Sequence, residues 1–152
     1  MIQRIQSVFL FVSLCFMIPM FFAPAANLVY ETGEILSFNL AGFYISEAGV
    51  TTRISAQYSL LAFGILICAL NLIIIFVYKS RVLQIRLCIY NILLLIGMTG
   101  VVMFLLHTLQ YNPSVKFRLP MVFPVVSAIL HYLAFRSIRK DELMVLALSR
   151  LR

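Results

Sequence analysis

The chain has 152 residues, of which 63% are apolar and only 11% are charged. Soluble domains draw about a quarter of their residues from Asp, Glu, Lys and Arg, so 12 basic and 5 acidic residues are too few to cover a water-facing surface. This composition excludes a soluble enzyme, a disordered tail and a cytosolic nucleic-acid-binding protein. The sequence therefore predicts a protein whose surface mostly contacts hydrocarbon.

Four stretches of the chain lack charged residues and are long enough to cross a bilayer, which takes about 20 apolar residues in a helix. Only helices and closed barrels satisfy their backbone hydrogen bonds in lipid, and these runs show no strand-like alternation. We expect a single integral membrane domain over 1–152, an all-α membrane protein with a four-transmembrane-helix bundle. The expected spans are about 5–26, 55–78, 87–107 and 119–136.

The basic residues indicate how these spans are oriented, because cytoplasmic loops carry an excess of Lys and Arg. With the N-terminus in the cytoplasm, nine of the 12 basic residues fall on the cytoplasmic side. The other three, Arg53, Lys116 and Arg118, fall on the opposite side together with three glutamates. We therefore expect both termini to be cytoplasmic. The positive charge then suits the anionic head groups of the lipid bilayer, and no nucleic-acid partner is expected.

The N-terminal segment has a second interpretation. Its basic start, apolar run and Ala23-Pro24-Ala25 sequence also resemble a secretory signal peptide with its cleavage site. Because the apolar run spans about 18 residues, more than the usual signal core, we favour a retained first helix and keep cleavage as the alternative.

The long outer connection, 27–53, contains strand-like and turn-like sequence. Residues 28–30 and 35–40 flank a turn with Gly33, and this order predicts a β-hairpin. Residues 43–45 could add a third strand after Gly42. Because an isolated hairpin is marginally stable in water, we expect this extracytoplasmic β-hairpin-like loop to lie on the helix ends or on another protein.

The C-terminal tail, 137–152, contains no Gly or Pro, and basic residues flank its apolar centre. We expect the fourth helix to continue past the bilayer and to bend onto the head groups as a cytoplasmic amphipathic C-terminal helix. Docking of this tail to a partner protein is the alternative.

Three polar residues within the spans, Asn71, Asn91 and His131, fall at a similar depth in the cytoplasmic half. Hydrogen bonds between helices at that depth would fix the packing of the bundle. A site for a small molecule or a lipid head group is the alternative. Gly97 and Gly100 share one face of the third span, and we expect them to let a neighbouring helix approach closely.

The sequence contains no recognisable catalytic or metal-binding pattern. It has no Ser-His-Asp set and no phosphate-binding loop, and no Asp or Glu lies within a predicted span. Cys15, Cys68 and Cys88 lack the spacing of metal ligands and are expected to be small buried hydrophobes. We expect no enzyme activity, no metal and no cofactor.

Basic residues near the cytoplasmic ends of the spans form a candidate surface for head groups or for a protein partner. They are Lys79, Arg81, Arg86, Arg136, Arg139 and Lys140.

Several cytoplasmic segments are similar to a known family. Met1–Gln6, Lys79–Cys88, Arg136–Glu142 and Ser149–Arg152 resemble a Bacteroidetes family of small inner-membrane proteins, a domain of unknown function called DUF4293. The resemblance covers essentially the whole chain and implies a four-helix protein of the bacterial inner membrane. It implies no activity, cofactor or catalytic residue.

These observations favour a non-enzymatic accessory or scaffold subunit that engages another membrane protein, with a homo-oligomer as a further possibility. The alternative is a binder or carrier of a lipid, quinone or other small apolar molecule that uses Asn71, Asn91 and His131.

Overall fold

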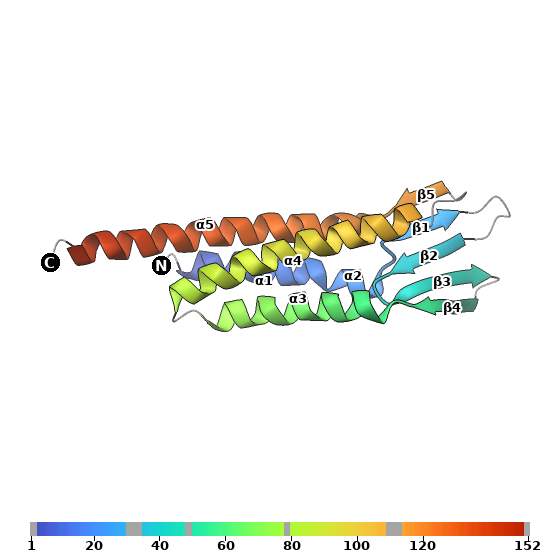
Figure 1. Ribbon diagram of the computed structural model, residues 1–152, viewed down its shortest axis with the longest axis horizontal. Coiled ribbons are helices and arrows are strands. Elements are labelled where there is room, and N and C mark those ends of the chain that lie inside the picture. Colours follow the sequence, from blue (N-terminus) through green and yellow to red (C-terminus); the bar gives the residue numbers. More distant parts are fainter. Residues whose placement is uncertain (1–2, 30–34, 48–49, 78–79, 109–113, 151–152) are drawn as a thin grey trace.

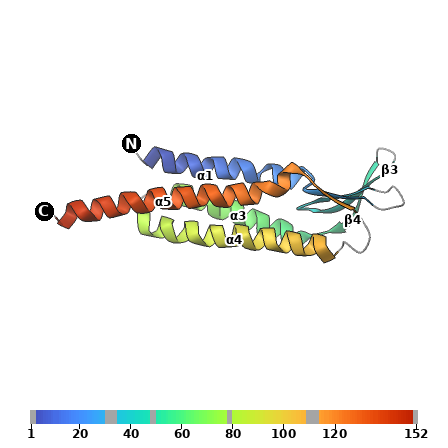
Figure 2. The same ribbon diagram turned by 90° about the horizontal axis from the view of Figure 1, so that it is seen from above.

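The structure is a computed structural model that describes residues 3–29, 35–47, 50–77, 80–108 and 114–150. Long helices lie side by side, and a small sheet extends from one end of the bundle (Figure 1). The described chain begins and ends at the other end, as the turned view also shows (Figure 2). We call these the sheet end and the terminal end.

The first helical segment is kinked at a proline. Helix α1, Gln3–Met17, continues through Ile18 into the short α2, Pro19–Phe22. Pro19 has no N–H to donate to the preceding turn, yet Ile18 still donates to the Leu14 carbonyl oxygen at 3.2 Å. The two helices therefore follow one another as a single apolar segment that is interrupted at Pro19.

The remaining helices are longer and run alternately up and down the bundle (Figure 1). They are α3 (Tyr58–Phe76), α4 (Arg81–Thr108) and α5 (Phe123–Arg150), the last preceded by the 3-10 turn η1 (Leu119–Val122). Helix α5 packs against both α1 and α4, and α3 packs against α4 and α1. The four predicted helices are thus present.

Each helix turns one stripe of residues inward, with successive members three or four positions apart. On α4 the stripe includes Cys88, Asn91, Leu95 and Met98. Alternating steps of three and four keep one face of a helix against its neighbours, as in coiled coils and four-helix bundles. The same spacing on the other helices gives Leu10, Ser13 and Met17; Leu60, Gly64, Ile67, Asn71 and Ile74; and Ser127, His131, Ala134 and Ile138.

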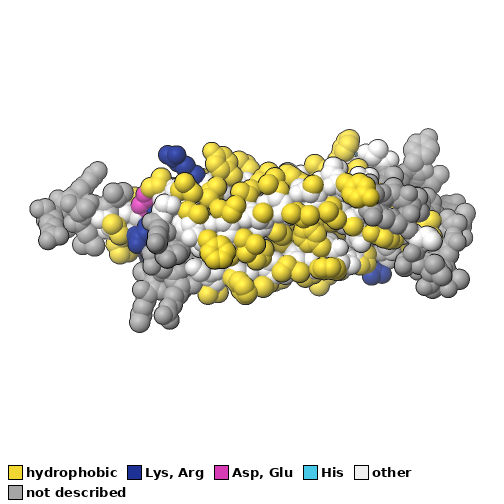
Figure 3. All heavy atoms as spheres, turned by 90° about the horizontal axis from the view of Figure 1, so that it is seen from below, with side chains coloured by type: hydrophobic (Ala, Val, Ile, Leu, Met, Phe, Trp, Pro, Cys, Tyr) yellow, Lys and Arg dark blue, Asp and Glu magenta, His cyan; other side chains and the backbone are white. Residues whose placement is uncertain are grey.

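The outward faces of the helices are apolar. Hydrophobic side chains cover the long middle section of the face in Figure 3, and the visible Lys and Arg side chains lie towards its two ends. Three helices, Tyr58–Phe76, Arg81–Thr108 and Leu119–Val145, are long and apolar enough to cross a membrane, whereas Gln6–Phe22 is a shorter apolar helix. The chain therefore has the character of a multi-pass membrane protein.

The outer connection is more than the predicted hairpin. It forms four strands, β1 (Ala26–Val29), β2 (Ile35–Asn39), β3 (Gly42–Glu47) and β4 (Val50–Ala56). A fifth strand, β5 (Ser114–Phe117), joins the free edge of β1, so the antiparallel sheet has the order β4-β3-β2-β1-β5. Strand β5 was not predicted, because a four-residue run becomes a strand only through pairing with β1.

A tight turn sets the register between β2 and β3. The Asn39 side-chain oxygen accepts hydrogen bonds from the amides of Ala41 (2.9 Å) and Gly42 (3.1 Å). Gly42 has a φ of 142°, a conformation that glycine adopts without steric cost. The third strand that we expected after Gly42 is confirmed.

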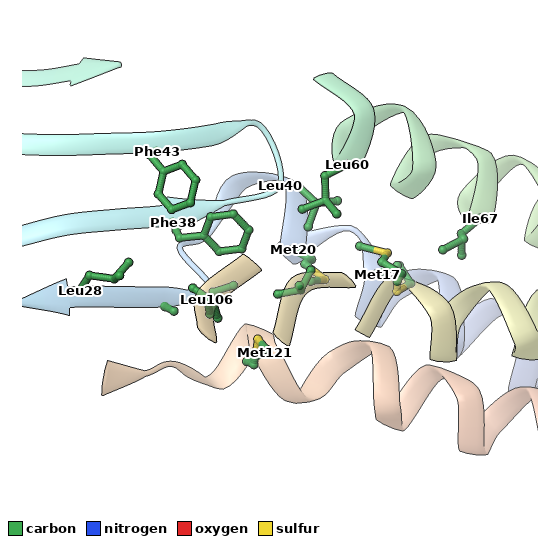
Figure 4. Packing of buried hydrophobic residues seen from close by; sticks show 14 of the residues in the cluster. Met17, Met20, Leu28, Phe38, Leu40, Phe43, Leu60, Ile67, Leu106 and Met121 are labelled. Carbon is green, nitrogen blue, oxygen red and sulfur yellow. The ribbon is translucent and has the colours of Figure 1, made fainter. Parts of the chain in front are cut away.

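The sheet and the sheet end of the bundle share one hydrophobic core. Leu28, Phe38 and Leu40 are fully buried, and they belong to the same cluster as Leu106 and Met121 from the helices (Figure 4). The loop is therefore packed on the helix ends, as the instability of an isolated hairpin predicts.

Several predicted boundaries were wrong. The first span was expected to reach residue 26, but Ala26 begins β1, and Ser55 lies in β4 rather than at the start of the second span. Helix α4 begins at Arg81 and contains the expected span of about 87–107, so the helix extends six residues beyond that span at its start. These ends shift because pairing in the sheet and helix propagation override hydropathy. The tail is helical as predicted, but α5 runs on without the expected bend (Figure 1).

Candidate functional site

The most distinctive site in the described chain is a group of polar side chains at the centre of the bundle. We call Ser13, Asn71, Asn91, Ser127 and His131 the polar cluster. All five are fully buried, and they come from α1, α3, α4 and α5. Each occupies the inward stripe of its helix, so the packing of the bundle itself brings them together.

His131 is the centre of the polar cluster. Its Nδ1 lies 2.9 Å from Ser13 Oγ and 3.0 Å from the Ser127 carbonyl oxygen, and its Nε2 lies 2.8 Å from Asn91 Nδ2. A carbonyl oxygen can only accept, which favours a proton on Nδ1, and Nε2 then accepts from the Asn91 amide. The neutral ring therefore has a partner at both nitrogens.

The serines link the other two helices to this histidine. Ser13 Oγ is hydrogen-bonded to Ser127 Oγ and accepts from Asn71 Nδ2 at 3.4 Å. Within the described residues, the side-chain oxygens of Asn71 and Asn91 have no hydrogen-bond partner. The polar cluster thus pairs all the donors named above, but it leaves two buried acceptors unpaired, each of which costs stability.

Apolar layers close the polar cluster on both sides. Towards the terminal end lies a cluster of Leu10, Ile74, Cys88, Ala134 and Ile138, and towards the sheet end lies the core shared with the sheet. A groove of about 340 Å³ between α4 and α5 is lined by residues such as Leu95, Gly100, Pro124 and Ala128, and by no member of the polar cluster. The geometry of the cluster therefore suits the fixing of helix packing.

The predicted polar layer is brought together by the fold. Asn91 contacts His131 directly, and Asn71 reaches it through Ser13. The sequence reasoning missed Ser13 and Ser127. Serine in an apolar helix can bond to its own backbone, so it gives little signal, although Ser127 lies one turn from His131 on the same face.

The glycines on α4 do not serve the role that we expected. Gly97 and Gly100 are exposed, and a Cβ atom on either would meet nothing within 4 Å. The glycine at a close approach is Gly64 on α3, where a Cβ atom would lie 2.5 Å from Leu40 Cδ2. The expectation failed because the inward stripe of α4 passes through Leu95, Met98 and Val102 instead.

The predicted basic residues lie on two helices at the terminal end. Arg86, Arg136, Arg139 and Lys140 are exposed and Arg81 is half-buried, while Lys79 lies outside the described residues. Beside them, Gln6 on α1 donates from Nε2 to Asp141 Oδ2 of α5 at 2.6 Å. This bond ties the two helices together beyond Ile138, the last buried apolar residue of α5 whose side chain the structure describes.

The cysteines are less uniform than predicted. Cys88 is buried, Cys68 is half-buried and Cys15 is exposed on the outside of α1. Cys15 departs from the expected burial because the inward stripe of α1 passes through Ser13 and Met17. Among the described residues, no three His, Cys, Asp or Glu side chains are grouped so that they could hold a metal ion.

The fold defines a multi-pass membrane protein with a small sheet at one end of a helical bundle. Comparison with known families adds an identification. The family model described as "Domain of unknown function (DUF4293)" matches residues 2–151, and the chain belongs to this family. No curated protein matches the chain. The resemblance noted in the sequence is thereby confirmed.

Proposed function

We propose that this protein is a non-enzymatic accessory subunit of the bacterial inner membrane that engages another membrane protein. One observation carries the proposal. The polar side chains buried in the spans bond to one another and are sealed by apolar layers, whereas the charged side chains lie at the ends of the helices. Polar residues inside a membrane that serve a substrate usually face a cavity, so an interaction at the helix ends fits this chain better.

We further propose that α1 and α2 cross the membrane together, which gives four crossings. From Arg4 to Phe22 the helical segment advances eighteen residues, or about 27 Å. The stretch from Arg118 through η1 and α5 to Arg136 advances the same number of residues, and the hydrocarbon core is about 30 Å thick. The position of α1 against α3 and α5 also places it within the bundle.

The orientation with both termini in the cytoplasm rests on charge and on aromatic anchors. Of the basic residues that the structure describes, seven belong to segments of the terminal end and three to segments of the sheet end, which suits the positive-inside rule. Tyr90 and Tyr132 are exposed on α4 and α5. Each lies one helical turn from an exposed arginine, Arg86 or Arg136, at the depth where tyrosine anchors helices in the head-group region.

A carrier of an apolar molecule is the second candidate. The groove between α4 and α5 supports it, because its volume of about 340 Å³ lies within the range of small-molecule sites. If the protein is such a carrier, the apolar ligand would lie against Leu95, Met103 and Val125 in this groove rather than against the polar cluster.

The test of the accessory role is the size of the protein's complex in its native membrane. After gentle solubilisation, native mass spectrometry should find the chain with a second protein at a fixed ratio. Arg139→Gln with Lys140→Gln should release it, and Lys116→Glu, an exposed change at the sheet end, should not. A chain found alone or only with a defined lipid would contradict the proposal, and the lipid would support the carrier.

A reporter fused to the C-terminus tests the orientation separately. We expect alkaline phosphatase at this position to be inactive and a fluorescent protein to be bright, because both report a cytoplasmic end. The opposite pair of results would overturn the proposed orientation.

A further inference from the structure

The last turns of α5 project beyond the rest of the bundle (Figures 1 and 2). Among the described side chains, the last buried one on the inward stripe of α5 is Ile138, and the last tie to α1 is at Asp141. The next position of the same stripe is Val145, which is 51% exposed. Among the described residues, none covers the stripe past this point.

This projecting segment is apolar in several directions at once. Leu143, Met144 and Val145 are 58%, 47% and 51% exposed, and successive helical residues point about 100° apart. Ala147 is exposed as well. We call Leu143, Met144, Val145 and Ala147 the α5 tip. A flat membrane surface would cover one side of such a helix, whereas a groove in a protein covers most of its circumference.

The position of the α5 tip also separates it from the lipid. The tip begins seven residues after the exposed Arg136, which is about 10 Å along the helix axis. Arg139 and Lys140 are exposed between the two. Because the Gln6–Asp141 bond holds α5 against α1 up to this level, the helix cannot bend back to the head groups before Asp141.

The charges beside the tip limit what can cover it. Arg139 and Lys140 are exposed on the preceding turn, whereas Asp141, which is bonded to Gln6, and Glu142 are half-buried. The described terminal end of the bundle carries more basic than acidic residues. A second copy of this chain would bring another basic end close to the first, which like-charge repulsion opposes. An apolar groove with acidic residues on its rim would complement both features of the tip.

We propose that the α5 tip is the docking element of this protein, inserted into an apolar groove with an acidic rim on a different protein. The inference rests on the proposed accessory role and specifies the partner's surface. Met144 and its neighbours fill the groove, and Arg139 and Lys140 pair with the rim. The membrane surface and a second copy are the competing occupants.

Cysteine labelling distinguishes these occupants. In a background with Cys15, Cys68 and Cys88 changed to Ala, single changes L143C, M144C and V145C report three directions of the tip. S80C, an exposed position in the connection at the same end, is the matched control. A membrane-impermeant maleimide is applied to inside-out vesicles from cells with native amounts of the protein, and to pure protein in phosphatidylethanolamine–phosphatidylglycerol vesicles.

The proposal expects all three tip positions to react about tenfold or more slowly in native membranes than in pure-lipid vesicles, with the control equally fast in both. Fast reaction in both preparations would show that nothing covers the tip. Slow reaction in both would assign the tip to lipid or to a second copy. Either of these two results overturns the docking proposal. If native mass spectrometry still finds a stable complex with a second protein, the accessory role itself remains supported.

A second pair of variants tests the acidic rim. R139Q with K140Q should speed the labelling of M144C in native membranes by about threefold or more, because the proposed ion pairs are lost. Unchanged labelling would refute the acidic rim. An unreactive S80C control in inside-out vesicles would instead show that the orientation is wrong.

Discussion

Replacement of His131 by leucine tests whether the polar cluster stabilises the bundle. The ring makes three contacts, with Ser13 Oγ, the Ser127 carbonyl oxygen and Asn91 Nδ2. Hydrogen bonds between membrane helices contribute about 0.6 kcal/mol each on average. The three contacts together contribute about 2 kcal/mol, and the stranded Asn91 amide costs about 1 kcal/mol more, so H131L should lower the free energy of unfolding by about 3 kcal/mol. The measurement is reversible unfolding by steric trapping in bicelles.

A second substitution turns this estimate into a sharper test. Asn91 has His131 as its only hydrogen-bonded side-chain partner among the described residues, and its oxygen is already unpaired. N91L added to H131L removes the stranded amide and should restore about 1 kcal/mol of the loss. I129A is the control, because Ile129 is exposed on the same helix. If H131L has the same free energy of unfolding as the natural protein, or if adding N91L lowers the free energy of unfolding further, the polar cluster does not stabilise the bundle in this way.

Two further predictions concern packing and the hold on α5. G64A should lower the free energy of unfolding by about 1–3 kcal/mol, since its Cβ atom would lie 2.5 Å from the buried Leu40 side chain. G97A should leave the free energy of unfolding unchanged or raise it by up to about 1 kcal/mol. Thermal unfolding in detergent compares the two variants, and equal effects would contradict the close packing at Gly64. Q6L should raise the rate of hydrogen exchange of the backbone amides near Asp141 about threefold to tenfold, because the hydrogen bond between Gln6 and Asp141 is lost. An unchanged exchange rate would show that this bond does not hold α5 against α1.

The sequence predicts the helices well because their signals are local. Uncharged runs of sufficient length predict all four helices. The similar depth of Asn71, Asn91 and His131 in their predicted spans indicates that these three residues form one layer. Depth says nothing about which side of a helix a residue faces, yet these three all lie on inward stripes. A buried polar side chain needs a partner, so polar residues of equal depth in neighbouring spans are expected to meet.

What the sequence did not predict depends on contacts between distant segments. Strand β5 exists because Val115 pairs opposite Leu28, far away in the chain. Ser13 joins the polar cluster only because α1 packs against α5. Gly97 and Gly100 illustrate the same limit, since their spacing shows a shared face but not which way that face points.

The same contacts that stabilise the bundle determine how the α5 tip is presented. Helix α5 is fixed through η1 and Met121 in the core at the sheet end, through His131 at the middle and through Asp141 at the terminal end. A helix held at three levels has a defined direction before any partner arrives. Because binding then costs less ordering entropy, loss of the Gln6–Asp141 bond should weaken docking even though neither side chain belongs to the tip. The polar cluster and the tip would thus serve one purpose, the first by rigidity and the second by contact.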